Sequence, residues 1–81
     1  MSKNIVITGT SSGIGLELTK FFIKNKHRVL AISRNNSDLR NLNLKGLYAV
    51  DFDITNFQKY HLLNKYLNNF ENVDVLINNA G

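Results

Sequence analysis

Residues 4–18 constrain the fold of this chain more than any other stretch of its sequence. The stretch begins with the apolar run Ile5, Val6 and Ile7, which predicts a short buried strand. Three glycines follow, at positions 9, 13 and 15, and an amphipathic pattern then begins. A strand that enters a helix through a glycine-rich turn directs backbone N–H groups and the positive end of the helix dipole at one point. The sequence therefore predicts a phosphate or pyrophosphate site at this turn.

Composition narrows the class of protein. With 81 residues, of which 43% are hydrophobic and 20% charged, the chain has the composition of one small globular domain. The absence of cysteine excludes disulfides, thiolate metal sites and a cysteine nucleophile. We find no signal peptide and no membrane-spanning run, so the expected location is the cytoplasm and no membrane partner is predicted.

The net charge of +4 raises the question of a nucleic-acid partner. The basic residues are spread along the chain, and no nucleic-acid-binding motif accompanies them. Solvated surface charge explains this pattern better, so no nucleic-acid partner is predicted.

Four short apolar runs alternate with helical patterns along the chain. The runs cover residues 5–7, 29–33, 47–50 and 73–77. Strands that alternate with helices at this spacing pair in parallel through right-handed crossovers. We therefore predict an α/β fold for residues 1–81: a partial Rossmann-type parallel sheet with the element order βαβαβαβ and strand order 3-2-1-4. Its switch point lies beside the first strand, where the glycine-rich turn stands.

Three helices are expected between these strands. The first ends near Asn25 and buries one apolar face, formed by Ile14, Leu18, Phe21 and Phe22. The second is short and is capped by Ser37 or Asp38. The third begins at Asn56, because Thr55 starts a capping-box pattern of the form S/T-x-x-E/Q.

Three stretches of this sequence resemble motifs of one known family. The string Thr8-Gly9-Thr10-Ser11-Ser12-Gly13-Ile14-Gly15 is similar to the cofactor motif of the short-chain dehydrogenase/reductase family. Asn78-Asn79-Ala80-Gly81, at the end of the fourth predicted strand, resembles that family's Asn-Asn-Ala-Gly signature. Asp53-Ile54 resembles its Asp-Val pair after the third strand. The resemblance covers the whole chain and implies a dinucleotide cofactor. The expected cofactor-binding residues are Gly9, Thr10, Ser11, Ser12, Gly13, Ile14, Gly15, Arg34, Asp53, Ile54, Asn79, Ala80 and Gly81.

The residues of the glycine-rich turn have separate expected roles. Gly9 takes a positive φ, Gly13 lets the backbone approach a ligand, and Gly15 lets the helix lie close to the strand. Backbone N–H groups near Ser12, Gly13 and Ile14 hold the pyrophosphate, and the hydroxyls of Thr10, Ser11 and Ser12 reach ribose or phosphate oxygens. The alternative for this turn is a tight connection that binds no ligand.

Two further positions bear on the cofactor. In this architecture, an acid at the end of the second strand binds the 2′-hydroxyl of NAD, whereas an arginine pairs with the 2′-phosphate of NADP. Arg34 stands there, so the resemblance favours NADP(H) over NAD(H); the alternative is an exposed arginine in a polar turn. By the same resemblance, Asp53 accepts a hydrogen bond from the adenine amino group and Ile54 covers the ring. The alternative for Asp53 is a turn residue.

The family's catalytic signature, Tyr-x-x-x-Lys, is absent. Tyr48, Tyr60 and Tyr66 are followed four residues later by Phe52, Asn64 and Phe70, and His27 and His61 have no partner at metal-ligand spacing. No catalytic or metal-binding residue is therefore predicted.

We expect this chain to be the N-terminal, NADP(H)-binding part of an oxidoreductase. The complete protein is expected to transfer hydride between NADP(H) and a carbonyl or alcohol substrate. The chain alone is expected to be inactive. The alternative is a stand-alone, non-catalytic nucleotide-binding or assembly module. The fourth strand is expected to have an unpaired edge, which predicts a homo-oligomer.

Overall fold

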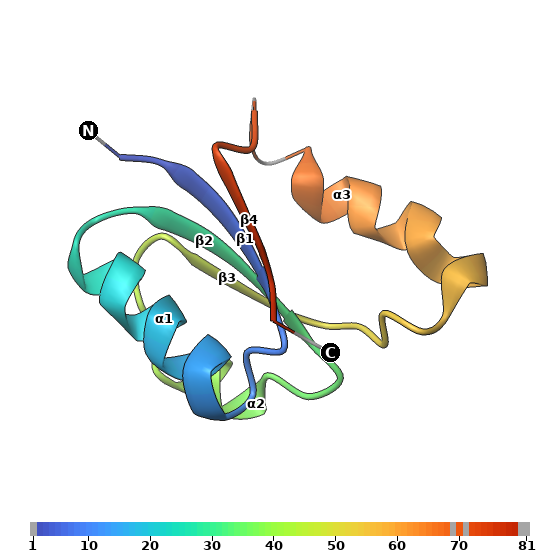
Figure 1. Cartoon of the computed structure of the whole chain (residues 1–81), viewed down its shortest axis with the longest axis horizontal. Coiled ribbons are helices and arrows are strands. Elements are labelled where there is room, and N and C mark those ends of the chain that lie inside the picture. The colour runs from blue at the N-terminus through green and yellow to red at the C-terminus, as the bar shows by residue number, and fades with distance from the viewer. Residues whose placement is uncertain (1, 69, 71, 80–81) are drawn as a thin grey trace.

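The computed structural model describes residues 2–68, 70 and 72–79, which form one parallel four-stranded sheet (Figure 1). Its strands are β1 (Asn4–Thr8), β2 (Arg28–Ser33), β3 (Leu47–Asp51) and β4 (Val75–Asn78). They lie in the order β3-β2-β1-β4, and β1 is paired with both β2 and β4. The fold class and the strand order predicted from the sequence are confirmed.

Helices cover both faces of this sheet. Helices α1 (Gly13–Lys24) and α2 (Ser37–Asn41) lie on one face, and α3 (Leu63–Leu67) lies on the other (Figure 1). A 3₁₀ helix, η1 (Phe57–Leu62), leads directly into α3. None of the helices in the described part of the chain is both long and apolar enough to cross a membrane.

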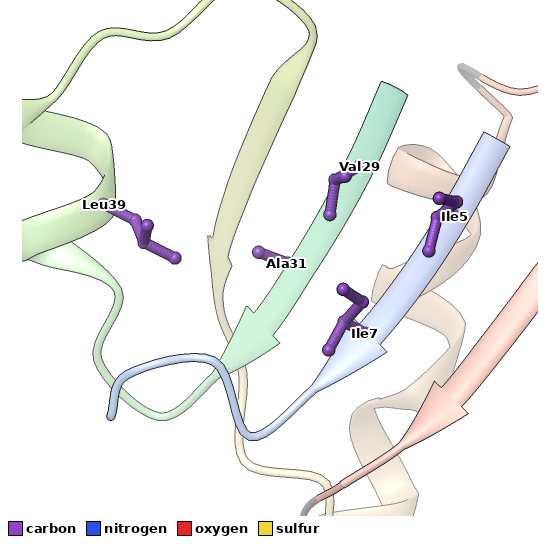
Figure 2. Packing of buried hydrophobic residues seen from close by; sticks show 5 residues of the cluster. All are labelled: Ile5, Ile7, Val29, Ala31 and Leu39. Atoms are coloured by element: carbon purple, nitrogen blue, oxygen red, sulfur yellow. The ribbon is translucent and has the colours of Figure 1, made fainter. Parts of the chain in front are cut away.

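Side chains of the central strands alternate between two apolar cores. Ile5 and Ile7 from β1 and Val29 and Ala31 from β2 point to the α1 and α2 face, where Leu39 of α2 meets them (Figure 2). The intervening residues of the same two strands, Val6, Leu30 and Ile32, point to the α3 face. There they form a second buried cluster with Val50 and Phe70. Because both faces of these strands are buried, their sequences are continuous apolar runs.

The buried face of α1 differs from the predicted one. Ile14 and Phe21 are 70% and 58% exposed, whereas Leu18 and Phe22 pack against the core as expected. The fully buried positions of this helix are Gly15 and Thr19. Gly15 sets this rotation, since its close approach to the end of β1 turns the face that contains it toward the sheet and carries Ile14 and Phe21 outward.

The end of α1 lies where the sequence predicts it, but a different residue takes the left-handed conformation. Asn25 is the C-cap with φ of −89°, and its Nδ2 donates to the Phe21 carbonyl oxygen at 2.8 Å. Lys26 follows with φ of 67°. The left-handed conformation thus falls on Lys26, one position after the residue near which the helix was predicted to end.

The predicted caps of the other two helices are wrong. The N-cap of α2 is Asn36, not Ser37 or Asp38, and its side chain makes no capping bond. At Thr55 the capping box does not form, because the Thr55 hydroxyl donates to Asp53 Oδ1 at 2.7 Å. A 3₁₀ helix that begins at Phe57, followed by the short α3, therefore replaces the single helix expected from Asn56.

Candidate functional site

The glycine-rich turn joins β1 to α1 at the carboxyl edge of the sheet. Gly9 and Gly13 have φ of 71° and 59°, in the left-handed region that favours glycine. Ser12 is the extended N-cap of α1, and its side chain makes no capping bond to the first turn. A Cβ on Gly13 would meet no atom of the described residues within 4 Å. The turn therefore has an open side at the N-terminus of a twelve-residue helix.

Gly15 has the close-packing role that the sequence predicts. A Cβ at this position would lie 2.1 Å from the Gly9 carbonyl oxygen and 2.7 Å from Asn79 Nδ2. Both distances are shorter than non-bonded atoms tolerate. Only glycine lets α1 begin so close to the end of β1.

The end of β4 is tied to the same turn by amide groups. Asn79 Nδ2 donates to the Gly9 carbonyl oxygen at 3.0 Å, and the Asn79 backbone N–H donates to Thr8 Oγ1 at 3.1 Å. The Thr8 hydroxyl donates to Asn78 Oδ1 at 3.1 Å. These bonds fix the first and fourth strand ends relative to each other. Ala80 and Gly81, which were also predicted to bind the cofactor, lie outside the described residues.

A cavity of about 330 Å³ lies beside this turn, between the carboxyl ends of β1, β2 and β3. It brings together five of the residues predicted from sequence: Gly9, Ser11, Arg34, Asp53 and Ile54. Ile32, Ser33, Phe52 and Thr55 complete its lining. Gly13 and Ile14 instead border a separate surface hollow along the outer side of α1. The cavity is within the size range of small-molecule sites and combines apolar walls with a few polar groups.

The charges at this cavity have opposite signs. Asp53 Oδ1 accepts hydrogen bonds from the Thr55 hydroxyl and from the Thr55 backbone N–H at 2.7 and 2.9 Å. These bonds, with a smaller contribution from the positive charge of Arg34, hold the pKa of Asp53 below its usual value. The carboxylate is therefore ionised at neutral pH, near an exposed guanidinium.

A buried hydroxyl at this cavity was not identified from the sequence. Ser33, the last residue of β2, is 7% exposed, and within the described part of the chain its Oγ has no hydrogen-bond partner. It lines the cavity next to Arg34. A buried hydroxyl without a partner is unfavourable, so a ligand atom that could hydrogen-bond to it would relieve that cost.

Thr10 differs from its prediction. It was expected to offer its hydroxyl to a ligand, but the residue is fully buried and the hydroxyl donates to Asn36 Oδ1 at 2.7 Å. Ser11 and Ser12 are exposed, as a ligand-binding role requires.

Asn36, like Ser33, was not identified from the sequence, because nothing in its sequence context distinguishes it from the other twelve asparagines of the chain.

Comparison with known proteins agrees with this geometry. A family model described as short chain dehydrogenase matches residues 3–81. The chain belongs to the short-chain dehydrogenase family.

Three relatives with known names are each about three times as long as this short-chain dehydrogenase chain. The NADP-dependent 3-hydroxy acid dehydrogenase YdfG of Shigella flexneri is 31% identical over 81 residues, an alignment that covers 95% of this chain and 33% of that protein. The solved structure of ElxO with NADP bound is 33% identical, with a TM-score of 0.78 over 100% of this chain and 36% of that one. The complex of 4-hydroxyisoleucine dehydrogenase with NADH is 34% identical, with a TM-score of 0.84 over 99% of this chain and 34% of that one. The chain thus spans about a third of the length of these family members.

Proposed function

We propose that this part of a short-chain dehydrogenase binds NADP(H), with the adenosine end of the cofactor in the cavity beside the glycine-rich turn. The observation that supports it best is that two groups line this cavity side by side: the guanidinium of Arg34 and the buried hydroxyl of Ser33, which has no hydrogen-bond partner among the described residues. A 2′-phosphate accepts hydrogen bonds and carries negative charge, so a guanidinium and a hydroxyl suit it. An acid at the end of β2 would instead suit the free 2′-hydroxyl of NAD(H).

The remaining residues fit other parts of the same cofactor. The open N-terminus of α1 and the backbone N–H groups near Ser12, Gly13 and Ile14 suit a pyrophosphate. The exposed Ser11 offers a hydroxyl at the cavity. Asp53 would accept from the adenine amino group, and Ile54 would cover the ring. Asn79, Ala80 and Gly81 are proposed to border the cofactor riboses.

The complete protein is proposed to be an oxidoreductase that acts on a carbonyl or alcohol substrate. When bound, the cofactor supplies the hydride chemistry, and the residues of this chain hold its adenosine and pyrophosphate. The alternative, a stand-alone nucleotide-binding module, is less well supported, because the family match extends over residues 3–81 and the relatives described above include two dehydrogenases.

Direct titration tests this proposal. We expect NADPH to bind the purified chain at least about tenfold more tightly than NADH, because only NADPH carries the phosphate that a guanidinium can pair with. The measurement is the change in cofactor fluorescence on addition of protein, confirmed by calorimetry. Binding of neither cofactor, or tighter binding of NADH, would contradict the proposal.

We also propose that the chain self-associates through β4. This strand is paired with β1 on one side, and no other described strand is paired with it. Leu76 of β4 is 66% exposed and borders an apolar groove of about 490 Å³ that runs between the sheet and α3. An open strand edge beside exposed apolar side chains favours pairing with a second copy.

Sedimentation velocity at increasing concentration is the measurement for self-association. The sedimentation coefficient of the wild-type chain is expected to rise with concentration, whereas Leu76→Lys stays monomeric because a charge at the edge opposes pairing. Leu42→Lys is the matched control. Leu42 is also an exposed leucine (48%), but it lies at the end of α2 and not on the edge strand β4. A wild-type chain that remains monomeric at high concentration would show that the edge does not pair.

A further inference from the structure

The side chain of Asn36 makes a fully buried polar junction between three segments. It is 1% exposed, and its Nδ2 donates to the carbonyl oxygens of Ala31 in β2 and Val50 in β3, at 2.9 and 2.8 Å. Its Oδ1 accepts from the Thr10 hydroxyl of the glycine-rich turn at 2.7 Å. The two strand carbonyls use both amide hydrogens, so only the oxygen is left to face Thr10. No carboxylate could replace this amide, because the oxygen in place of Nδ2 would face two carbonyl oxygens with no hydrogen to donate.

The backbone around Asn36 is anchored to the end of β3. The Asn36 N–H donates to Asp51 Oδ1 at 2.7 Å, and the Phe52 N–H donates to the Ser33 carbonyl oxygen at 2.7 Å. Arg40 also donates to Asp51 Oδ1 at 2.7 Å. The hydrogen bonds from Arg40 and from the Asn36 N–H hold the pKa of the Asp51 carboxyl below its usual value. Between the anchored residues Ser33 and Asn36 lie only two residues, the first of which is Arg34.

The glycine-rich turn is joined to this segment at two points. The Gly9 N–H donates to the Ile32 carbonyl oxygen at 2.8 Å, immediately before the segment begins. The Thr10–Asn36 bond joins the turn to the residue at which the segment ends. The position of Arg34 relative to the turn is therefore set from both sides.

We propose that Asn36 is a positioning residue that, through its bond to Thr10, holds Arg34 at the correct separation from the glycine-rich turn and so determines selectivity for a cofactor that carries a 2′-phosphate. This inference rests on the proposed function. The two binding sites are Arg34, for the 2′-phosphate, and the glycine-rich turn, for the pyrophosphate. Covalent bonds of the cofactor fix the distance between these two groups, so a displacement of one site relative to the other lowers the affinity of the ligand that uses both. NADPH uses both sites, whereas NADH lacks the phosphate that meets Arg34.

The test removes the Thr10 hydroxyl and compares two cofactors. Thr10→Val is expected to weaken NADPH binding by about tenfold and NADH binding by less than about twofold, so the preference for NADPH falls. Thr10→Ser keeps the hydroxyl and is expected to restore the wild-type preference. Thr19→Val is the matched control: Thr19 is equally buried, and its hydroxyl donates within α1 to the Gly15 carbonyl oxygen at 2.8 Å. It is expected to lower stability without changing the preference.

A double-mutant cycle separates positioning from direct contact. If Thr10 acts through Arg34, Thr10→Val has no further effect on NADPH affinity once Arg34→Ala is present. Equal losses for NADPH and NADH in Thr10→Val would overturn the inference while leaving the proposed function intact. A wild-type chain that binds neither cofactor would overturn both. Circular dichroism melts verify folding of each variant, and Thr10→Ala, which adds no methyl group toward Asn36, carries the same expectation if Thr10→Val does not fold.

Discussion

Replacing Gly15 by alanine is expected to destabilise the fold by about 3–5 kcal/mol, which is most of the stability of a domain this small. The new Cβ would lie 2.1 Å from the Gly9 carbonyl oxygen and 2.9 Å from its carbonyl carbon. Both are backbone atoms, so no change of rotamer can relieve the overlap. Helix α1 would have to move away from the sheet, and its side chains Leu16, Leu18, Phe22 and Ile23 would lose contact with the core. Urea denaturation followed by circular dichroism measures the loss.

Gly13→Ala is the matched control for this prediction. It makes the same substitution two residues earlier, where a Cβ meets nothing within 4 Å and only the φ of 59° opposes alanine. The left-handed conformation costs a non-glycine residue about 1–2 kcal/mol, so this variant should fold and be only modestly less stable. Equal stability of the two variants would show that the close approach of α1 to β1 is not required.

The roles of Gly9 and Gly15 were predictable because each follows from local covalent geometry. A strand, a turn and a helix within fifteen residues leave few paths for the backbone, and positive φ at Gly9 and close packing at Gly15 follow from those paths. The strand order was predictable for a similar reason. Parallel strands with short right-handed crossovers, and a glycine-rich turn after the first, allow few arrangements of four strands.

The mispredicted positions are ones where another contact overrides the local sequence pattern. Periodicity assigned Ile14 and Phe21 to the buried face of α1, but the rotation of a helix is set by its closest contact, which here is made by Gly15. Thr55 matched a capping box, yet the nearby Asp53 carboxylate is the acceptor that its hydroxyl reaches. For α1 the competitor is a contact with another element of the fold, whereas for Thr55 it is a carboxylate only two residues away that the capping-box pattern does not take into account.

The candidate site was predictable to the extent that its residues stand at strand ends. Arg34 follows β2 directly and Asp53 lies two residues after the end of β3. Parallel strands bring their carboxyl ends to one edge, so the cavity that these residues share with Gly9 follows from topology. Ser33 and Asn36 could not be recognised in this way. Their importance comes from burial. The Ser33 hydroxyl is buried without a hydrogen-bond partner in the described part of the chain, and the Asn36 side chain makes three buried hydrogen bonds. Burial of a polar group leaves no pattern in the sequence.

Reversing the charge of Arg34 is expected to have the largest effect on cofactor binding. In Arg34→Glu, NADPH affinity should fall by about 100-fold or more, since the variant loses a charge-assisted hydrogen bond and places a carboxylate against the 2′-phosphate. NADH affinity should change by less than about threefold, because a free 2′-hydroxyl can donate to a carboxylate. Titration of both cofactors, followed by fluorescence, gives the two ratios. Arg34 is exposed and forms no part of either apolar core, so the variant is expected to fold normally.

The control for the charge itself is Lys24→Glu. Lys24 is an exposed cation in the last turn of α1, at the opposite end of that helix from the glycine-rich turn, so the substitution makes the same change in net charge far from the cavity. At an ionic strength of about 0.15 M, charges separated by more than about 8 Å in solvent are largely screened, and NADPH affinity should remain close to that of the wild type. If Lys24→Glu weakened NADPH as much as Arg34→Glu, the attraction would come from the overall charge of the chain. The 2′-phosphate would be placed at the end of β2 only if Arg34→Glu lowers the affinity for NADPH and not for NADH, and Lys24→Glu lowers neither.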